Sequence, residues 1–124
     1  MPVGRLHHLI FDCADPAVSG RFWSAVLGLP VTYADPDFVV VSVDTSTSGL
    51  AFQRAADHRA PTWPDPEVPQ QSHLDVMVDD LAVAAEAVLG LGARRLPGGE
   101  DVFADPAGHP FCLIPRPGWA SPVN

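Results

Sequence analysis

Two histidines stand at matching places in the chain and are the first candidates for chemistry. His8 precedes Asp15 by seven residues and His73 precedes Asp80 by the same interval, so a shift of 65 residues relates the two pairs. Imidazole binds transition metals and transfers protons near neutral pH. One histidine on a strand is most often incidental, but two at repeated positions favour a shared pocket in which polar groups converge.

The residues around each histidine alternate in a way that predicts strands with two different faces. Successive strand side chains point to opposite sides of a sheet. The apolar faces hold Leu9, Phe11 and Cys13 in the first segment, and Leu74, Val76 and Val78 in the second. The mixed faces hold His8, Ile10 and Asp12, and His73, Asp75 and Met77. We expect the apolar faces to pack on helices, which leaves the mixed faces for a cavity.

These strands belong to an order of strand, helix and three strands that is predicted twice. Asp15-Pro16 and Asp79-Asp80 are typical helix starts, and Gly28 and Gly90 are typical helix ends. The predicted strands are 6–13, 30–34, 38–43 and 50–54, and then 73–78, 93–96, 101–104 and 110–114; the helices run to Gly28 and over 81–89. A repeat of this kind predicts two βαβββ modules in an α+β fold.

A proline-rich segment, 55–71, separates the two copies and is expected to be an irregular crossover. The prediction is one domain over 1–124, with module one at 5–54, module two at 72–114 and a tail at 115–124. Trp63 lies between two prolines of the crossover. A large aromatic side chain in an irregular segment needs a cover, and we expect Trp63 at the rim of the pocket.

Composition excludes several classes of partner. The chain has 124 residues, 47% of them hydrophobic, and a net charge of −8. Nucleic acids and anionic membranes need a basic face, so neither is expected as a partner. No apolar run reaches the length of a bilayer span, and residues 1–10 lack the apolar core of a signal peptide. We therefore expect a cytoplasmic protein whose two cysteines are free thiols.

Several motifs together resemble the vicinal oxygen chelate superfamily, the glyoxalase, bleomycin-resistance and dioxygenase group. They are His8 with Asp15, RFW at 21–23, LGL at 27–29, FQR at 52–54, PTWP at 61–64, HLDV at 73–76 and DPAGHPFC at 105–112. The middle motifs resemble a bacterial glyoxalase-like subgroup. The resemblance covers nearly the whole chain and implies curved mixed sheets around a cavity, together with frequent dimerisation. The free edges of such sheets also favour a homodimer.

The resemblance also implies four metal-ligand positions, which fall on His8, Gln53, His73 and Cys112. Gln53 is neutral, and Cys112 stands where a glutamate ligand and base would be expected. Without that carboxylate the chain lacks the base for glyoxalase isomerisation and the third member of a two-histidine, one-carboxylate iron triad. Among common ions, zinc alone suits two imidazoles and a thiolate.

Two functions follow as hypotheses. The first is a glyoxalase-like protein that binds a small organic molecule, for example a sequestered drug, in a cavity lined by His8 and His73 without the usual metal site; Gln53, Asp75, Cys112 and Trp63 would complete the pocket. The alternative is a metal-dependent lyase, isomerase or dioxygenase, with zinc or another divalent ion. A dimerising regulator without catalysis is a third class, to which no residue points.

Overall fold

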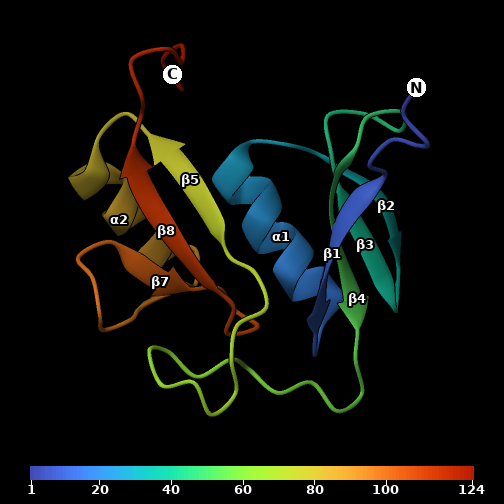
Figure 1. Ribbon diagram of the computed structural model, residues 1–124, viewed down its shortest axis with the longest axis horizontal. Helices are drawn as coiled ribbons and strands as arrows, with labels where there is room; N and C mark the ends of the chain where they lie inside the picture. The colour runs from blue at the N-terminus through green and yellow to red at the C-terminus, as the bar shows by residue number, and fades with distance from the viewer. The chain divides into compact units, whose positions relative to one another are not determined.

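The structure is a computed structural model that describes residues 1–124, in two compact units, 1–58 and 59–124 (Figure 1). The first unit holds β1 (His8–Cys13), α1 (Pro16–Leu27), β2 (Val31–Asp35), β3 (Phe38–Val41) and β4 (Gly49–Arg54). The second holds β5 (Leu74–Val78), α2 (Leu81–Gly90), β6 (Arg94–Arg95), β7 (Val102–Ala104) and β8 (Pro110–Pro115). The predicted α+β class with two βαβββ modules is confirmed, and we call them module one and module two.

Module one is a four-stranded sheet with one face covered by α1. Its strand order is β1-β4-β3-β2, with β1 parallel to β4 and the other pairs antiparallel. The helix begins where predicted, because the Asp15 side chain accepts a hydrogen bond from the Ala17 amide, and it ends at Gly28, whose φ of 66° suits glycine. The covered face buries Phe11, Val39 and Phe52. The opposite face, which carries His8 and Ile10, lacks a helix of this module.

Helix α1 lies very close to this sheet because one of its residues has no side chain. A Cβ atom added to Gly20 would lie 2.5 Å from Cγ1 of Val39. Real Cβ atoms do not approach carbon so closely, so the helix position requires glycine here. The glycine lowers helix propensity by about 1 kcal/mol, and the close packing of α1 on β3 offsets that loss.

Module two repeats the arrangement. Its strand order is β5-β8-β7-β6, with β5 parallel to β8 and the other pairs antiparallel. The Asp80 side chain caps α2 by accepting a hydrogen bond from the Val83 amide at 3.0 Å. Phe103 and Phe111 stack with ring centroids 5.8 Å apart and are fully buried. These rings form the core of the module.

The two modules share details beyond the order of their elements. The Ala55 amide donates to the Cys13 carbonyl, and the Arg116 amide donates to the Val78 carbonyl, both at 2.9 Å. Each bond closes the last strand of a module onto the end of its first strand. Arg54 Nη1 also donates to the Ala14 carbonyl, whereas Arg116 Nε donates to the carboxylate of Asp79. The repeat predicted from the histidine and aspartate spacing is therefore a repeat of the backbone.

Several predicted strands are longer than the observed ones. Strand β3 ends at Val41 and not at residue 43, and β6 spans only two residues. His73 was expected inside the first strand of module two, but it precedes β5, since the pairing of β5 with β8 begins at Leu74 and Phe111. No helix is long and apolar enough to cross a membrane.

Candidate functional sites

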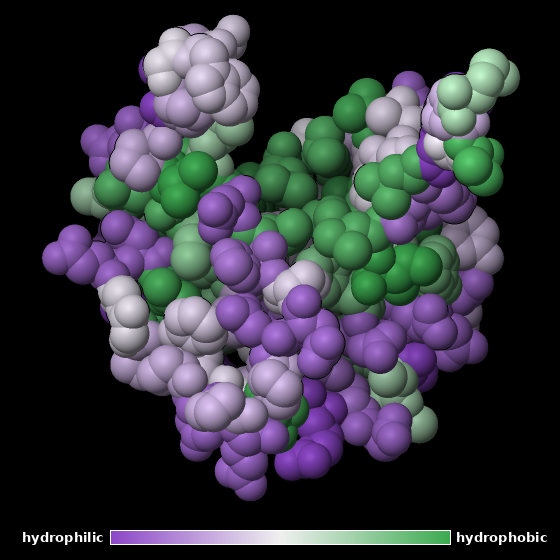
Figure 2. All heavy atoms as spheres, viewed as in Figure 1, coloured by the Kyte–Doolittle hydropathy of each residue, from purple (hydrophilic) through white to green (hydrophobic).

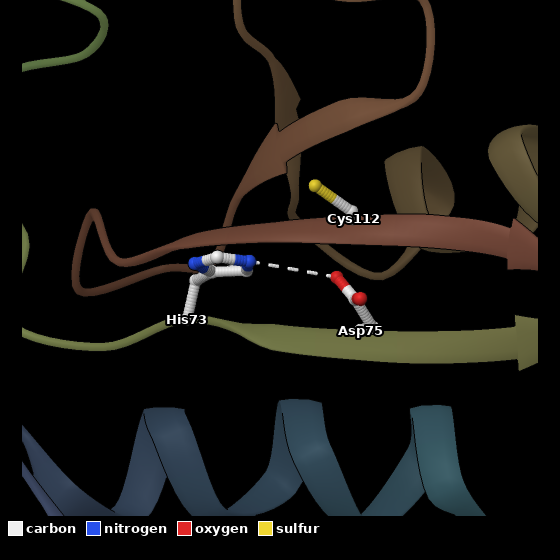
Figure 3. A group of neighbouring side chains, drawn as sticks. All are labelled: His73, Asp75 and Cys112. Atoms are coloured by element: carbon white, nitrogen blue, oxygen red, sulfur yellow. Dashed lines mark ion pairs between the residues drawn. The ribbon is translucent and has the colours of Figure 1, made fainter.

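Three side chains that can ligate a metal converge in module two. Asp75 and Cys112 are paired across the parallel strands β5 and β8, so their side chains leave the same face of the sheet. His73, two residues before Asp75, joins them on that side (Figure 3). One ligand atom from each residue lies within 4.8 Å of the others, and His73 Nε2 is 3.6 Å from Asp75 Oδ1. We call this set the His-Asp-Cys cluster.

The cluster keeps Cys112 protonated at neutral pH. Burial raises the pKa of the Cys112 thiol, and the carboxylates of Asp75 and Asp101 raise it further because they repel a thiolate. The His73 and Asp75 side chains are 45% and 53% exposed, so solvent reaches the cluster. In the absence of a cation, Cys112 is therefore a weak nucleophile.

The orientation of His73 distinguishes between two kinds of chemistry. A nucleophilic relay needs the thiol on one ring nitrogen and the carboxylate on the other. In Figure 3 one ring nitrogen of His73 faces Asp75, on the side where Cys112 also lies, and the other nitrogen points away. Nitrogen, oxygen and sulfur thus surround one point, an arrangement that suits a single cation better than a relay.

Trp63 covers the sheet beside this cluster. Its indole Nε1 donates to the Pro97 carbonyl at 2.8 Å, and its ring packs with Cys112 against a buried apolar cluster of Leu96, Val102 and Ala104. The ring therefore has the cover that an aromatic side chain in an irregular segment needs. Trp63 and Cys112 thus share one apolar cluster as their packing surface.

A separate groove lies on the open face of module one. Its volume is ≈ 560 Å³, within the range of sites for small organic molecules. It is lined by residues of β1, β2 and β3 and of the two flanking loops, namely His7, His8, Ile10, Thr32, Tyr33, Asp35, Phe38, Val40, Ser42, Asp44 and Thr45. Figure 2 shows apolar atoms gathered over the strands of this module. Ile10 is 47% exposed and Tyr33 53% exposed, which leaves apolar surface open to a ligand.

His8 lines this groove with its ring held by a backbone hydrogen bond. The Gly49 amide donates a hydrogen bond of 3.1 Å to His8 Nδ1, so this nitrogen acts as the acceptor and Nε2 is the ring nitrogen that can donate. The ring also lies against His7, with centroids 3.9 Å apart. His8 therefore offers the groove its Nε2 nitrogen as a hydrogen-bond donor.

Two carboxylates stand at opposite ends of the groove. Asp35 ends β2, and Asp44 follows β3 beyond Val41, which pairs with Val31 at the start of β2. Hydrogen bonds from Tyr33 and from the Asp37 amide lower the pKa of Asp35, and bonds from Thr47 and Ser46 lower that of Asp44. Both are ionised at neutral pH. Each residue lies just beyond a predicted strand, 30–34 or 38–43, and neither was predicted as a site residue. The alternation of β2 and β3 was the signal that could have placed their neighbours on the open face.

Gln53 occupies a different register position from Cys112. Gln53 pairs with Asp12. In module two, Cys112 pairs with Asp75, which lies two residues after His73. In module one, the residue two after His8 is Ile10, and it pairs with Ala51. Ala51 is therefore the equivalent of Cys112. Module one thus has a histidine but no second ligand at the matching positions. His8 lies in the groove and His73 in the His-Asp-Cys cluster; that both line one cavity stays a prediction.

Comparison with known proteins agrees with this architecture. The family model described as "Glyoxalase-like domain" matches residues 8–114. The chain belongs to this glyoxalase-like family. No curated protein sequence matches the chain significantly. The family lies in the glyoxalase, bleomycin-resistance and dioxygenase superfamily that the motifs resembled.

Solved structures share the fold at low sequence identity. A glyoxalase/bleomycin resistance protein/dioxygenase family enzyme from Burkholderia phytofirmans PsJN has a TM-score of 0.67 at 15% identity, over 89% of this chain and 97% of its own. Fosfomycin resistance protein FosX from Mesorhizobium loti has a TM-score of 0.61 at 19% identity, over 96% and 97%. The bleomycin-binding protein of Streptomyces verticillus, solved with copper(II)-bleomycin, has a TM-score of 0.53 at 18% identity, over 92% and 98%. These structural matches establish the fold of the glyoxalase-like chain alone. Its ligand has to be inferred from its own residues.

Proposed function

We propose that this glyoxalase-like protein binds a small organic molecule in the groove of module one. The observation that carries the proposal is the groove itself, whose ≈ 560 Å³ would hold a molecule of modest size. Ile10, Phe38 and Val40 provide apolar and aromatic surface, and Thr32 and Ser42 provide a few hydroxyl groups. An apolar lining with a small number of placed polar groups is the usual composition of such sites. The bleomycin-binding relative offers a precedent for binding on this fold.

A substitution that fills the groove tests this proposal. Ile10→Trp adds a large side chain at a position that is 47% exposed, so the sheet tolerates it while the groove loses volume. The matched control is Val83→Trp on α2, a position that is 67% exposed and lies in the other module. A fragment library is screened by ligand-observed NMR against the wild-type protein, and hits are mapped on backbone amides. We expect hits to shift amides of β1–β3 and to lose binding in Ile10→Trp alone. Hits that bind both variants equally would contradict the proposal.

The His-Asp-Cys cluster supports a second candidate, metal-dependent chemistry in module two. Its donor set of imidazole nitrogen, carboxylate oxygen and sulfur fits zinc, which takes such ligands in a tetrahedron and keeps one position open in catalytic sites. In that geometry the ligand atoms lie about 3.5 Å apart. The separations here, up to 4.8 Å, require a modest closing of the three side chains. When bound, zinc would supply a Lewis acid held by His73, Asp75 and Cys112.

Cobalt distinguishes this candidate from metal-free binding. Co²⁺ substitutes for Zn²⁺ and gives a sulfur-to-metal absorption band when a thiolate coordinates it. The second candidate predicts this band on titration of the reduced protein and its loss in Asp75→Asn and Cys112→Ser. Gln53→Ala is the control, because Gln53 lies at another register position. Absence of cobalt binding would leave the groove as the functional site and remove the metal candidate.

Assembly and location complete the proposal. β1 and β2 lie at the edges of one sheet, and β5 and β6 at the edges of the other. Because unpaired strand edges favour association, we propose a homodimer of single-domain chains. Both cysteines are free thiols, which fits a reducing cytoplasm. Sedimentation at micromolar concentration tests the dimer, and a monomer there would contradict it.

A further inference from the structure

We infer that the ligand of the module-one groove is a small organic cation with an apolar body. The inference rests on the proposed function of the groove and goes beyond it in naming the chemical class of the ligand. The features that carry it are the carboxylates at the two ends of the groove and the aromatic pair beside Asp35.

The charges that line the groove are negative. Asp35 stands at one end of the β2–β3 pair and Asp44 at the other, and no arginine belongs to the lining. Arg54, a cation on the neighbouring strand β4, is held by partners outside the lining of the groove. Its guanidinium donates to the carbonyls of Ala14 and Pro36 and pairs with Asp37. An anionic ligand would therefore meet two like charges and no arginine or lysine to offset them.

The hydrogen bonds around each carboxylate hold it in place and in its charged form. Asp35 Oδ2 accepts from the Tyr33 hydroxyl at 2.6 Å, and Oδ1 accepts from the Asp37 amide at 2.8 Å. Asp44 Oδ1 accepts from the Ser46 amide and the Thr47 hydroxyl, and Oδ2 takes part in neither bond. The charge at each end of the groove is thus fixed in position and present at neutral pH. The Asp44 carboxylate keeps one oxygen to accept a hydrogen bond from an ammonium group.

Aromatic rings lie at the Asp35 end of the groove. Tyr33 and Phe38 meet at 60° with centroids 6.4 Å apart, and both line the groove. The faces of such rings attract organic cations through their quadrupole. Ile10 and Val40 add aliphatic surface for the apolar body of the ligand. Charge at both ends and aromatic surface beside Asp35 together favour a cation over a neutral molecule of the same shape.

Three probes with one body and different charge test the inference. Benzylamine, benzyl alcohol and benzoate share a phenyl ring and carry a positive charge, no charge and a negative charge at neutral pH. Their affinities are measured by NMR titration of the wild-type protein, with amides of β1–β3 as the reporter. We expect benzylamine to bind about tenfold more tightly than benzoate at low salt, from two exposed carboxylates and a cation–π contact, and salt to reduce this preference.

A paired variant separates the charge from the shape of the groove. Asp35→Asn with Asp44→Asn keeps one amide oxygen at each turn to accept the local hydrogen bonds, while it removes both charges. We expect the three probes to bind this variant with similar affinity. The control is Asp57→Asn, an exposed residue of the crossover outside the groove, which should keep the wild-type preference.

The outcomes separate the inference from the proposed function. Equal binding of all three probes to the groove of the wild-type protein would overturn the cation and leave small-molecule binding standing. Tighter binding of benzoate would do the same. If none of the probes shifts amides of β1–β3, both the inference and the proposed function fail. A benzylamine preference that survives in the paired variant would overturn the role of Asp35 and Asp44, and with it the inference.

Discussion

Gly20→Ala tests how tightly α1 packs on the face of the sheet opposite the groove. The added Cβ would lie 2.5 Å from Cγ1 of Val39, which is 4% exposed and held by the sheet. Relieving an overlap of this size costs about 1–3 kcal/mol, whereas alanine gains about 1 kcal/mol in helix propensity over glycine. We expect the substitution to lower the free energy of unfolding by about 1 kcal/mol, measured by urea denaturation at 25 °C.

A double-mutant cycle tests whether the Val39 side chain causes this loss of stability. Val39→Ala removes the methyl group that the new Cβ would meet, so in that background Gly20→Ala should raise the free energy of unfolding, by up to about 1 kcal/mol. Gly90→Ala in α2 is the control, because a Cβ there meets nothing within 4 Å and is expected to be neutral or slightly stabilising. A Gly20→Ala protein more stable than wild type, or a cycle that is additive, would refute the close packing of α1 on β3.

Three further predictions concern module two. Because burial and the neighbouring carboxylates raise the pKa of Cys112, iodoacetamide should label it slowly at pH 8 and faster in Asp75→Asn, as followed by mass spectrometry; equal rates would contradict the role of Asp75. Backbone amides of the last two residues bind the Asp79 carboxylate, whose pKa they and Arg116 lower. Compared with an unstructured peptide at the same pH, these amides should be protected from hydrogen exchange at neutral pH and lose that protection as pH falls below the ordinary carboxyl range; in Asp79→Ala they should show no protection at any pH. Trp63→Phe should lower the free energy of unfolding by about 1 kcal/mol through loss of the bond to Pro97, and Trp63→Ala by about 2 kcal/mol or more; no change in either would mean that the ring does not cover the sheet.

The sequence determined the repeat and the local structure that follows from it. Asp15 and Asp80 were predicted to start the helices, and both cap them, because a carboxylate satisfies the free amides of a first turn wherever it occurs. Alternation along the first strand predicted a buried Phe11 and an open face with His8 and Ile10. These features depend on neighbours in the sequence, which is why they can be read before any fold is known.

The tertiary structure decided which side chains meet. Asp75 was expected on the cavity side, but only the parallel register of β5 and β8 set it opposite Cys112 and made the His-Asp-Cys cluster. The register of β1 and β4 likewise sets Gln53 opposite Asp12. Ala51 therefore occupies the position near His8 that was expected for Gln53. The groove carboxylates of Asp35 and Asp44 lie just beyond the predicted strands and were not predicted as site residues. Register and the pairing of distant strands depend on contacts across many residues of the chain, so composition and spacing cannot supply them.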